Sequence, residues 1–476
     1  MQNVSLVYDV VVIGGGPVGE NVADRAHTTG LSTVIVEGEL VGGECSFWAC
    51  EPSKALLRPV VARADARRVP GLRQAVQGPL DVTAVLAHRD AMSGHWQDED
   101  QVEWLKQEGV DLIRGHGRLD GPKQVTVQTH DGERIRLSAR HAVALCTGTS
   151  AVVPDLQGLA EVRCWTSREA TSAHEVPGRL AMVGGGVVAV EMATAWQALG
   201  SRVTLLVRED GLLGCMEPFA GEMVAQSLRE AGVDVRFETK VTSVARAGGE
   251  LRIELADGGK LTSDEILFAI GRAPRTSDVG LETVGLTPGD WLTVDDTCQV
   301  TAVDGGWLYA VGDVNHRALL THQGKYQARI AGAVIGARAK GEPLDDSWWG
   351  AHVATADSVA VPQVVFTDPE VASVGLTTRE AERTGRRVDV VDYDIGQVAG
   401  AVQFAEDYRG NARVLIDTDR GTVAGATFVG PGVGELLHSA TIAVIGEVPI
   451  DRLRHAVPAF PTISEVWLRL LETYRT

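Results

Sequence analysis

The sequence predicts an α/β protein in which one strand–turn–helix–strand unit occurs twice. Three observations lead to this fold class. The chain has 476 residues, more than one hydrophobic core can hold, so we expect about two to four domains. It contains 54 glycines, the residue that tight turns beside phosphate groups require. Two glycine-rich turns follow β-rich runs in register, since Gly14 and Gly30 recur 170 residues later as Gly184 and Gly200.

The first unit has the pattern of a dinucleotide-binding βαβ motif. Residues 10–13 and 33–36 are β-rich, and a helix-like stretch joins them. The turn before that stretch contains Gly14, Gly16, Pro17 and Gly19. In such motifs the first glycine turns the chain, the second lets the backbone approach a pyrophosphate, and the third packs helix on strand. The N-terminus of the helix then faces the anion.

The second unit repeats this pattern with one change. Its β-rich runs are residues 180–183 and 203–207, and its turn contains Gly184, Gly186, Val187 and Val188. Ala189 stands at the third glycine position. A single motif of this kind is weak evidence, but two copies in register predict two dinucleotide sites.

The residues that end the two units predict different cofactors. Glu37 ends the first, where a carboxylate can bond ribose hydroxyls, so this unit suits FAD. The second has Val207 at that position, followed by Arg208. A carboxylate there would repel a 2′-phosphate, whereas an arginine would pair with it. The second unit therefore favours NADPH over NADH, and a merely solvated Arg208 is the simpler alternative.

A close cysteine pair, Cys45 and Cys50, follows the first unit. The spacing fits about one helical turn plus a lead-in, so the two sulfurs could meet. A zinc site would need two more ligands, and the sequence offers no second cysteine pair or histidine cluster. A buried structural pair is the other alternative. The position just after the flavin turn favours redox work, in which one sulfur accepts electrons and the other attacks the substrate as a thiolate.

The cysteine segment, residues 42–54, resembles the redox-active motif of the FAD-dependent pyridine nucleotide-disulfide oxidoreductases. That family includes dihydrolipoamide dehydrogenase, glutathione reductase, mycothione reductase and mercuric reductase. Further segments resemble its two glycine turns, its flavin-holding Gly-Asp motif, the start of its interface domain and its C-terminal active-site motif, in this order: residues 146–148, 269–274, 309–313, 365–370 and 461–465.

The resemblance implies an architecture of two Rossmann-like domains and a C-terminal α+β dimerisation domain. The FAD domain would cover residues 1–150 and resume at 276–346, with the NAD(P) domain inserted at 151–275. Residues 347–476 would form the dimerisation domain. Members of the family are homodimers in which the C-terminal motif completes the active site of the partner.

The resemblance also implies residue roles. Cys45 would be the interchange thiol and Cys50 the thiol beside the flavin, while Lys54 and Glu191 would form an ion pair near the flavin. Glu465 would belong to the catalytic set through the C-terminal motif. Beyond the residues already named, the expected cofactor-binding residues include Cys45, Lys54 and Glu191 again, and the following positions: Gly43, Glu44, His116, Gly117, Thr147, Gly148, Val241, Gly271, Arg272, Gly312, Asp313, Leu320, Thr321 and His322. No metal ligand is predicted.

The chain departs from the family at its C-terminus. Disulfide-reducing members have a histidine before the Pro-Thr of this motif, which serves as acid and base for the interchange thiol, and here that position is Phe460. A phenyl ring cannot transfer a proton, and such transfer is typically worth about 10²–10⁴ in rate. His455 is a candidate to replace it, and a structural or surface histidine is the alternative. Glu51 after Cys50, and Glu44 before Cys45, would raise a thiol pKa if they face it.

Relatives that lack this histidine do not match the chain fully. Soluble transhydrogenases have an aromatic residue there but lack the second cysteine, and mercuric reductases have an additional C-terminal cysteine pair. The chain keeps Cys50 and ends without such a pair. The other cysteines are interpreted as packing residues: Cys146, Cys164, Cys215 and Cys298.

We therefore expect an NAD(P)H-dependent flavoprotein oxidoreductase that passes electrons through Cys45 and Cys50 to a disulfide or another small acceptor. The alternatives are a diaphorase, quinone reductase or transhydrogenase acting directly from flavin, and a redox-sensing flavoprotein. The net charge of −19 argues against nucleic-acid binding. No apolar run is long enough to predict a membrane span, and no signal peptide is recognisable, so we expect a cytoplasmic protein.

Overall fold

The computed structural model describes residues 4–474, which divide into two compact units. The first unit holds the described residues up to Glu51, together with residues 90–151 and 272–358. The second holds residues 52–89, 152–271 and the described residues from Val359 onward. The four-part domain division expected from the sequence stays a prediction.

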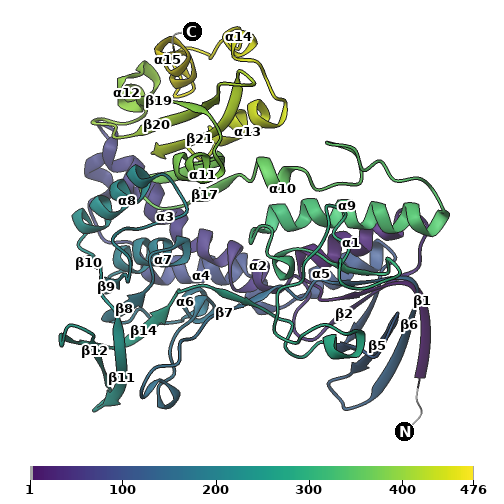
Figure 1. The fold of residues 1–476 in the computed structure, drawn as a ribbon. Helices are drawn as coiled ribbons and strands as arrows, with labels where there is room; N and C mark the ends of the chain where they lie inside the picture. The colour runs from purple at the N-terminus through teal and green to yellow at the C-terminus, as the bar shows by residue number, and fades with distance from the viewer. Residues whose placement is uncertain (1–3, 475–476) are drawn as a thin grey trace. The chain divides into compact units, whose positions relative to one another are not determined.

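A mixed seven-stranded sheet forms the centre of the first unit (Figure 1). Its strand order is β3-β2-β1-β6-β5-β4, and β16 also pairs with β6. The strands β1, β2, β3, β6 and β16 pair in parallel, whereas β5 runs antiparallel to both of its neighbours, β6 and β4. The bounds are β1 (Val4–Ile13), β2 (Thr33–Glu37), β3 (Asp111–Arg114), β4 (His116–Leu119), β5 (Gln124–Gln128), β6 (Arg134–Leu145) and β16 (Leu308–Ala310). The apolar run at residues 10–13 is buried, as expected for a parallel strand covered on both faces.

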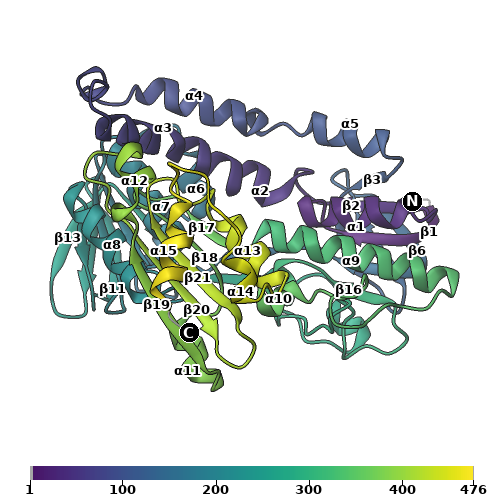
Figure 2. The same ribbon diagram turned by 90° about the horizontal axis from the view of Figure 1, so that it is seen from above.

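Two helices of this unit, α1 (Pro17–His27) and α9 (Thr321–Lys340), lie side by side (Figures 1 and 2). Glycines on α9 permit the close approach, because a Cβ atom on Gly332 would come within 2.7 Å of Arg25 Cβ. The same unit contains α2 (Gly43–Phe47), α5 (Glu99–Gln107) and the short strands β7 (Thr149–Ala151) and β15 (Arg272–Pro274). The helices α3 (Cys50–Arg68), α4 (Val82–Met92) and α10 (Ala356–Val359) contain points where the chain passes from one unit to the other.

The second unit contains a parallel sheet of order β10-β9-β8-β14. Its strands are β8 (Arg179–Val183), β9 (Arg202–Leu206), β10 (Asp234–Arg236) and β14 (Glu265–Phe268). Helices α6 (Ser167–Ser172), α7 (Val187–Ala198) and α8 (Pro218–Glu230) belong to this part, and α7 buries Trp196 completely. An antiparallel sheet of β11 (Val241–Ala247), β12 (Glu250–Leu255) and β13 (Lys260–Ser263) completes it.

The C-terminal part of the second unit is an antiparallel five-stranded sheet of order β17-β18-β21-β20-β19. Its strands are β17 (Gln363–Val365), β18 (Glu370–Gly375), β19 (Val388–Asp394), β20 (Asn411–Asp417) and β21 (Thr422–Gly430). The helices are α11 (Thr378–Thr384), α12 (Ala399–Phe404), α13 (Leu437–Ile445), α14 (Ile450–Leu453) and α15 (Glu465–Thr473). Figure 2 shows α13 and α15 beside this sheet, and Trp467 of α15 stacks edge-on against Phe428 of β21.

Across residues 4–474, none of the helices combines the length and the apolar character that crossing a bilayer demands.

Candidate active site

In the first glycine turn, two glycines lie so close to backbone carbonyl oxygens that no side chain would fit. Gly14 has a φ of 105°, and a Cβ atom there would lie 2.4 Å from the carbonyl oxygen of Cys146. A Cβ on Gly19 would lie 1.8 Å from the carbonyl oxygen of Gly14. Only glycine fits either position. Gly16 caps α1 ahead of Pro17, and a Cβ there would meet nothing closer than Gly43 Cα at 3.9 Å. The space before the helix N-terminus is therefore open, which suits a pyrophosphate.

Glu37 is tied to this turn. One carboxylate oxygen accepts the Gly15 N–H at 2.6 Å, and the other accepts the Glu39 N–H at 2.7 Å. The carboxylate is thereby fixed at the end of β2, beside the glycine turn. This placement is compatible with the ribose contact expected from the sequence, which stays a prediction.

A second cluster in the same unit gathers residues from three distant segments. Asp313 accepts the Thr149 hydroxyl at 2.7 Å, and Arg272 donates to the same hydroxyl oxygen at 2.5 Å and to the Thr149 carbonyl at 2.9 Å. Burial raises the pKa of Asp313, while the Thr149 bond and Arg272 lower it. The hydroxyl of Thr147 is buried and has no hydrogen-bond partner within the described chain. A buried hydroxyl without a partner, two residues from the threonine that holds the Asp313 carboxylate, is what a polyhydroxy ligand such as FAD would satisfy.

The cysteine segment begins next to the glycine turn. The Gly42 N–H donates to the Gly15 carbonyl at 2.8 Å, and a Cβ on Gly43 would lie 3.0 Å from Gly16 Cα. Cys45 lies in α2 and Cys50 opens α3, because the chain leaves helical geometry at Trp48, where φ is −139°. The sequence predicted about one helical turn here, and the structure has two helices with a break between them.

The two cysteines are free thiols that hydrogen-bond each other. Cys50 Sγ also lies 3.3 Å from Thr321 Oγ1, at the start of the 20-residue helix α9. The hydrogen bond with Cys50 raises the pKa of the Cys45 thiol, and burial and the charge of Cys50 raise it further, whereas Thr321 lowers it. The helix N-terminus and the hydroxyl both favour a negative charge on sulfur at this place.

The two glutamates beside the cysteines differ in their orientation. Glu51 is exposed, and its charge is the last of the influences that raise the pKa of Cys45. Glu44 instead accepts from Arg275 Nη2 at 2.6 Å. Arg275 was not expected as a site residue, since nothing in the sequence links it to Glu44, which lies 231 residues earlier.

Lys54 and Glu191 meet in the second unit, as the expected ion pair. Lys54 Nζ lies 2.8 Å from Glu191 Oε2 and also 4.9 Å above the ring of Phe366. The side chain of Glu191 is 4% exposed, and its other oxygen accepts the Phe366 N–H at 3.0 Å. The role of this pair beside a flavin stays a prediction.

The second glycine turn repeats the geometry of the first. Gly184 has a φ of 134°, and a Cβ there would lie 2.3 Å from the Ala269 carbonyl oxygen. Gly186 caps α7, whose first residues are Val187 and Val188. Arg208 follows β9, is 78% exposed and donates to the Glu209 carboxylate at 2.6 and 3.0 Å.

The remaining expected cofactor residues are spread over both units. In the first, Gly148 has a φ of 67° and Gly312 one of 81°, Leu320 caps α9, and His322 lies in its first turn. His116 Nε2 lies 2.7 Å from the Asp278 carbonyl, and a Cβ on Gly117 would meet Val36 at 2.9 Å, so Gly117 serves packing within the sheet. In the second, Val241 opens β11 and is buried, and Gly271 has a φ of 140°.

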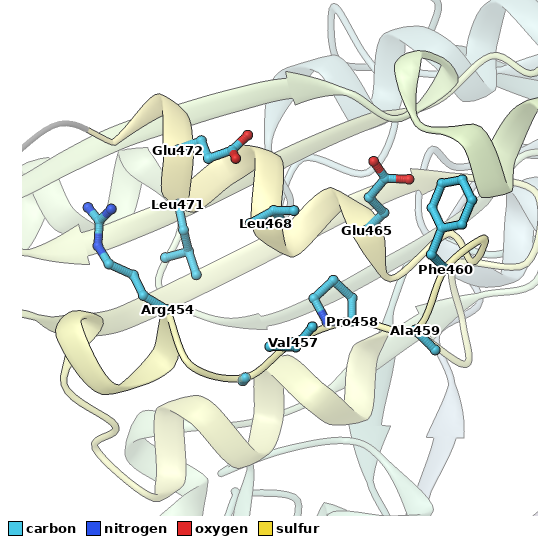
Figure 3. Close-up of a pocket in the computed structure, with 10 residues that line it drawn as sticks. Arg454, Val457, Pro458, Ala459, Phe460, Glu465, Leu468, Leu471 and Glu472 are labelled. Carbon is cyan, nitrogen blue, oxygen red and sulfur yellow. The ribbon is translucent and has the colours of Figure 1, made fainter.

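The C-terminal motif presents an aromatic ring rather than a proton carrier. Phe460 is 77% exposed and lines a cavity of about 230 Å³ between the segment 454–460 and α15 (Figure 3). Glu465 accepts from Arg469 at 2.7 Å through one oxygen, and its other oxygen is buried with no partner among the described residues. His455 is exposed and does not line this cavity.

The other cysteines differ in accessibility. Cys146 and Cys298 are buried, which raises the pKa of both thiols. Cys164 is half-buried, and Cys215 is exposed.

Comparison with known proteins gives consistent matches along the chain. Residues 8–333 match the family described as pyridine nucleotide-disulphide oxidoreductase, and residues 361–470 match its dimerisation domain. Dihydrolipoyl dehydrogenase 3 of Pseudomonas aeruginosa is 31% identical over 96% of both chains. Mercuric reductase of Acidithiobacillus ferrooxidans is 32% identical over 96% of this chain and 80% of its own.

Solved structures agree in fold. LpdA from Mycobacterium tuberculosis has a TM-score of 0.83 at 25% identity, covering 98% of this chain and 99% of its own. The flavoprotein disulfide reductase RclA from Escherichia coli, in its Cu(II) complex, has a TM-score of 0.83 at 22% identity, with full coverage of both chains.

Proposed function

Because this chain belongs to the pyridine nucleotide-disulphide oxidoreductase family, we propose that it passes electrons from NADPH, with FAD bound, to the Cys45–Cys50 pair and on to a small disulfide or other acceptor. Membership makes the chain an NAD(P)H-dependent flavoprotein oxidoreductase. The proposed route depends on one observation: the thiols of Cys45 and Cys50 hydrogen-bond each other and the hydroxyl of Thr321, at the start of a long helix.

The chain's own residues suit FAD in the first unit. When bound, FAD supplies two-electron transfer between a nicotinamide and a disulfide. Gly16 and the N-terminus of α1 would hold its pyrophosphate, and Glu37 would bond a ribose. Asp313 and Thr147 would bond its hydroxyl-bearing chain, because one is a fixed carboxylate and the other a buried hydroxyl in need of a partner.

The cysteines then divide the sulfur chemistry between them. Two electrons break the Cys45–Cys50 bond and, with one proton taken up, leave a thiol on Cys45 and a thiolate on Cys50. The hydrogen bond between the sulfurs lets Cys50 take the proton from Cys45. The Cys45 thiolate attacks the acceptor disulfide, which forms a mixed disulfide and expels one acceptor thiolate. Cys50 then loses its proton to solvent and attacks Cys45, which restores their bond and releases the second acceptor sulfur as a thiolate.

The C-terminal motif limits the choice of acceptor. Phe460 offers no proton to a departing thiolate, and the raised pKa of Cys45 makes its own deprotonation costly. The best acceptor is therefore a disulfide whose leaving thiol is acidic, since it needs no protonation to depart. The match to a dimerisation domain supports a homodimer, and we propose that this motif lies at the partner's active site.

A direct flavin reaction is the second candidate. The same two features, Phe460 and the raised pKa of Cys45, favour a quinone, a dye or a second nicotinamide as acceptor. A purely redox-sensing role would instead appear as reduction of Cys45–Cys50 without steady turnover of any acceptor.

Cysteine variants decide between these routes. We expect Cys45→Ser and Cys50→Ser each to abolish reduction of activated aromatic disulfides under NADPH, while Cys215→Ser, at an exposed cysteine, leaves it unchanged. Quinone reduction is measured in parallel on the same three proteins. Disulfide turnover that survives both active-site substitutions would refute the proposed route, and quinone turnover that survives alone would favour the second candidate.

Arg208 supports the choice of NADPH. Its guanidinium would pair with a 2′-phosphate, and in the structure it forms an exposed ion pair with Glu209. We expect Arg208→Gln to lower kcat/KM for NADPH by about tenfold or more, with little change for NADH. The reason is that only NADPH has the 2′-phosphate with which Arg208 would form an ion pair. Glu209→Gln should act in the opposite direction. Steady-state kinetics with both nucleotides measure this, and equal losses for both would favour a solvated role for Arg208.

A further inference from the structure

A buried polar network lies behind the Gly312–Asp313 turn in the first unit. Gln327 of α9 is fully buried, and its amide oxygen accepts the Gly312 N–H at 2.9 Å and Asn315 Nδ2 at 2.8 Å. Its amide nitrogen donates to Asp357 Oδ2 at 2.9 Å. The side chain of Asp357 is 1% exposed.

Asp357 is held by two further donors. Arg317 Nε donates to Asp357 Oδ2 at 3.0 Å, and Gln323 Nε2 donates to Asp357 Oδ1 at 2.8 Å. Gln323 and Gln327 lie four residues apart on α9 and are both buried, so they project from one face of the helix. Of these two glutamines, only Gln327 also hydrogen-bonds the Gly312–Asp313 turn.

The direction of the hydrogen bonds in this network is fixed by Asp357. A carboxylate can only accept, so it orients the amide nitrogen of Gln327 toward itself and leaves the amide oxygen facing Gly312. The reversed amide would place two donors against the Gly312 N–H and Asn315. Because the network is buried, an unmet donor or acceptor in it is costly.

We propose that Gln327, oriented by Asp357, is a positioning residue that holds the Gly312–Asp313 turn in the shape required for FAD binding. The inference rests on the proposed FAD site and extends it to residues behind the turn. Gly312 has a φ of 81°, a conformation open to glycine because it has no Cβ atom, and the Gln327 oxygen fixes the direction of the Gly312 N–H within that range. Asp313 follows directly and carries the carboxylate expected to bond the flavin chain.

The matched pair of helix glutamines tests this. We expect Gln327→Leu to weaken FAD binding to the apoprotein by about tenfold to a hundredfold, and Gln323→Leu by less than about threefold. Both substitutions remove one buried donor to Asp357, so both should lower the apoprotein melting temperature, and Gln327→Leu should lower it further because the Gly312 N–H and Asn315 also lose their acceptor. FAD affinity is read from the change in flavin fluorescence on titration.

A second measurement does not depend on the flavin. Hydrogen exchange of the apoprotein should become faster at Gly312 and Asn315 in Gln327→Leu and remain unchanged in Gln323→Leu. If Gln327→Leu does not fold, Gln327→Met keeps the side-chain length and should give the same pattern.

Equal FAD affinities in the two leucine variants, while the unsubstituted protein binds FAD, would overturn this inference and leave the proposed function intact. An unsubstituted protein that binds no FAD would overturn the proposed function and this inference with it.

Discussion

At the scale of single residues, Thr321 opposes the influences that keep the Cys45 thiol protonated. Its hydroxyl lies 3.3 Å from Cys50 and lowers the pKa of Cys45. A hydroxyl can donate its proton to a thiolate but adds little to a neutral thiol, so it should stabilise the ionised form. Thr321 thus links the charge on the sulfurs to the N-terminus of α9.

We expect Thr321→Val to raise the pH at which the reduced pair first ionises by about one unit, because one hydrogen bond to a charged group is lost. Thr321→Ser keeps the hydroxyl and should remain within about a third of a unit of the unsubstituted protein. Thiolate absorbance in the ultraviolet, followed against pH on the reduced protein, measures both. Identical titrations of the two variants would show that the hydroxyl has no electrostatic role.

Glu20 is a second residue with a clear pH consequence. Burial raises its pKa to about 7, Glu37 adds to the rise, and Lys325 opposes it. One of its oxygens is buried without a partner among the described residues. The folded protein therefore favours the protonated acid, and its contribution to stability is present below pH 4.5 and is lost as the pH rises through about 7.

Glu20→Gln should flatten this dependence. We expect the apoprotein's unfolding free energy to change less between about pH 5 and pH 8 in this variant, by at most about 3 kcal/mol, than in the unsubstituted chain. Urea unfolding at the two pH values measures the difference. Glu133→Gln, at an exposed carboxylate, is the control and should leave the dependence unaltered.

Residues with a spacing signal could be predicted from the sequence, and residues without one could not. Cys45, Cys50 and the glycine turns have characteristic neighbours, and the structure brings the two thiols together. Gln327 and Asp357 lie 30 residues apart in segments with no motif, so only the fold shows that they meet. Arg208 was expected for its charge, but its pairing with the adjacent Glu209 could not be foreseen.

At the scale of elements, the two glycine turns show how one local pattern gives one local shape. The β-rich runs expected at residues 180–183 and 203–207 correspond to β8 and β9, which end within one residue of expectation. β1 begins six residues before the expected run, because its early part pairs with β6 along the sheet. Tertiary pairing of this kind has no signature in local periodicity.

Within the first turn, Gly16 and Gly19 should respond differently to the same substitution. Gly19→Ala places a methyl group 1.8 Å from a carbonyl oxygen, so we expect the apoprotein to lose stability by about 1–3 kcal/mol or more. Gly16→Ala meets nothing closer than 3.9 Å and has an ordinary φ of −73°, so the apoprotein should keep its stability.

FAD affinity separates the two cases further. Gly16→Ala should weaken it by more than about tenfold, because the methyl group would occupy the space that a pyrophosphate needs. Thermal melting of the apoprotein and FAD titration form the two readouts. A Gly16→Ala protein with unchanged FAD affinity would remove Gly16 from the proposed site.

At the scale of the whole molecule, the C-terminal part exposes apolar side chains that a second copy could cover. Ile442 on α13 is 56% exposed and Phe460 is 77% exposed, both within the segment that matches a dimerisation domain. Isolated apolar residues are ordinary on a protein surface, but their coincidence with that segment supports a homodimer.

We expect Ile442→Asp to shift the protein from twice the mass of one chain toward the single-chain mass, because a charge would be buried in the interface. Sedimentation across a concentration series measures this. Val7→Asp, at a 51% exposed valine of β1 outside the dimerisation segment, should have no effect. If each active site contains residues of both subunits, the rate of disulfide reduction should fall as the fraction of dimer falls, while FAD stays bound.

Cys215 has a practical consequence for such experiments. Cys215 is exposed, whereas the other cysteines of the described chain are buried or half-buried. With the redox pair oxidised and Cys146 and Cys298 buried, a maleimide dye should couple first at this position. A fluorophore placed there reports on the second unit, at a residue that the proposed electron route does not use. Single-molecule and energy-transfer studies would then need no introduced cysteine for labelling. The Cys215→Ser variant, which lacks this thiol, is the unlabelled control.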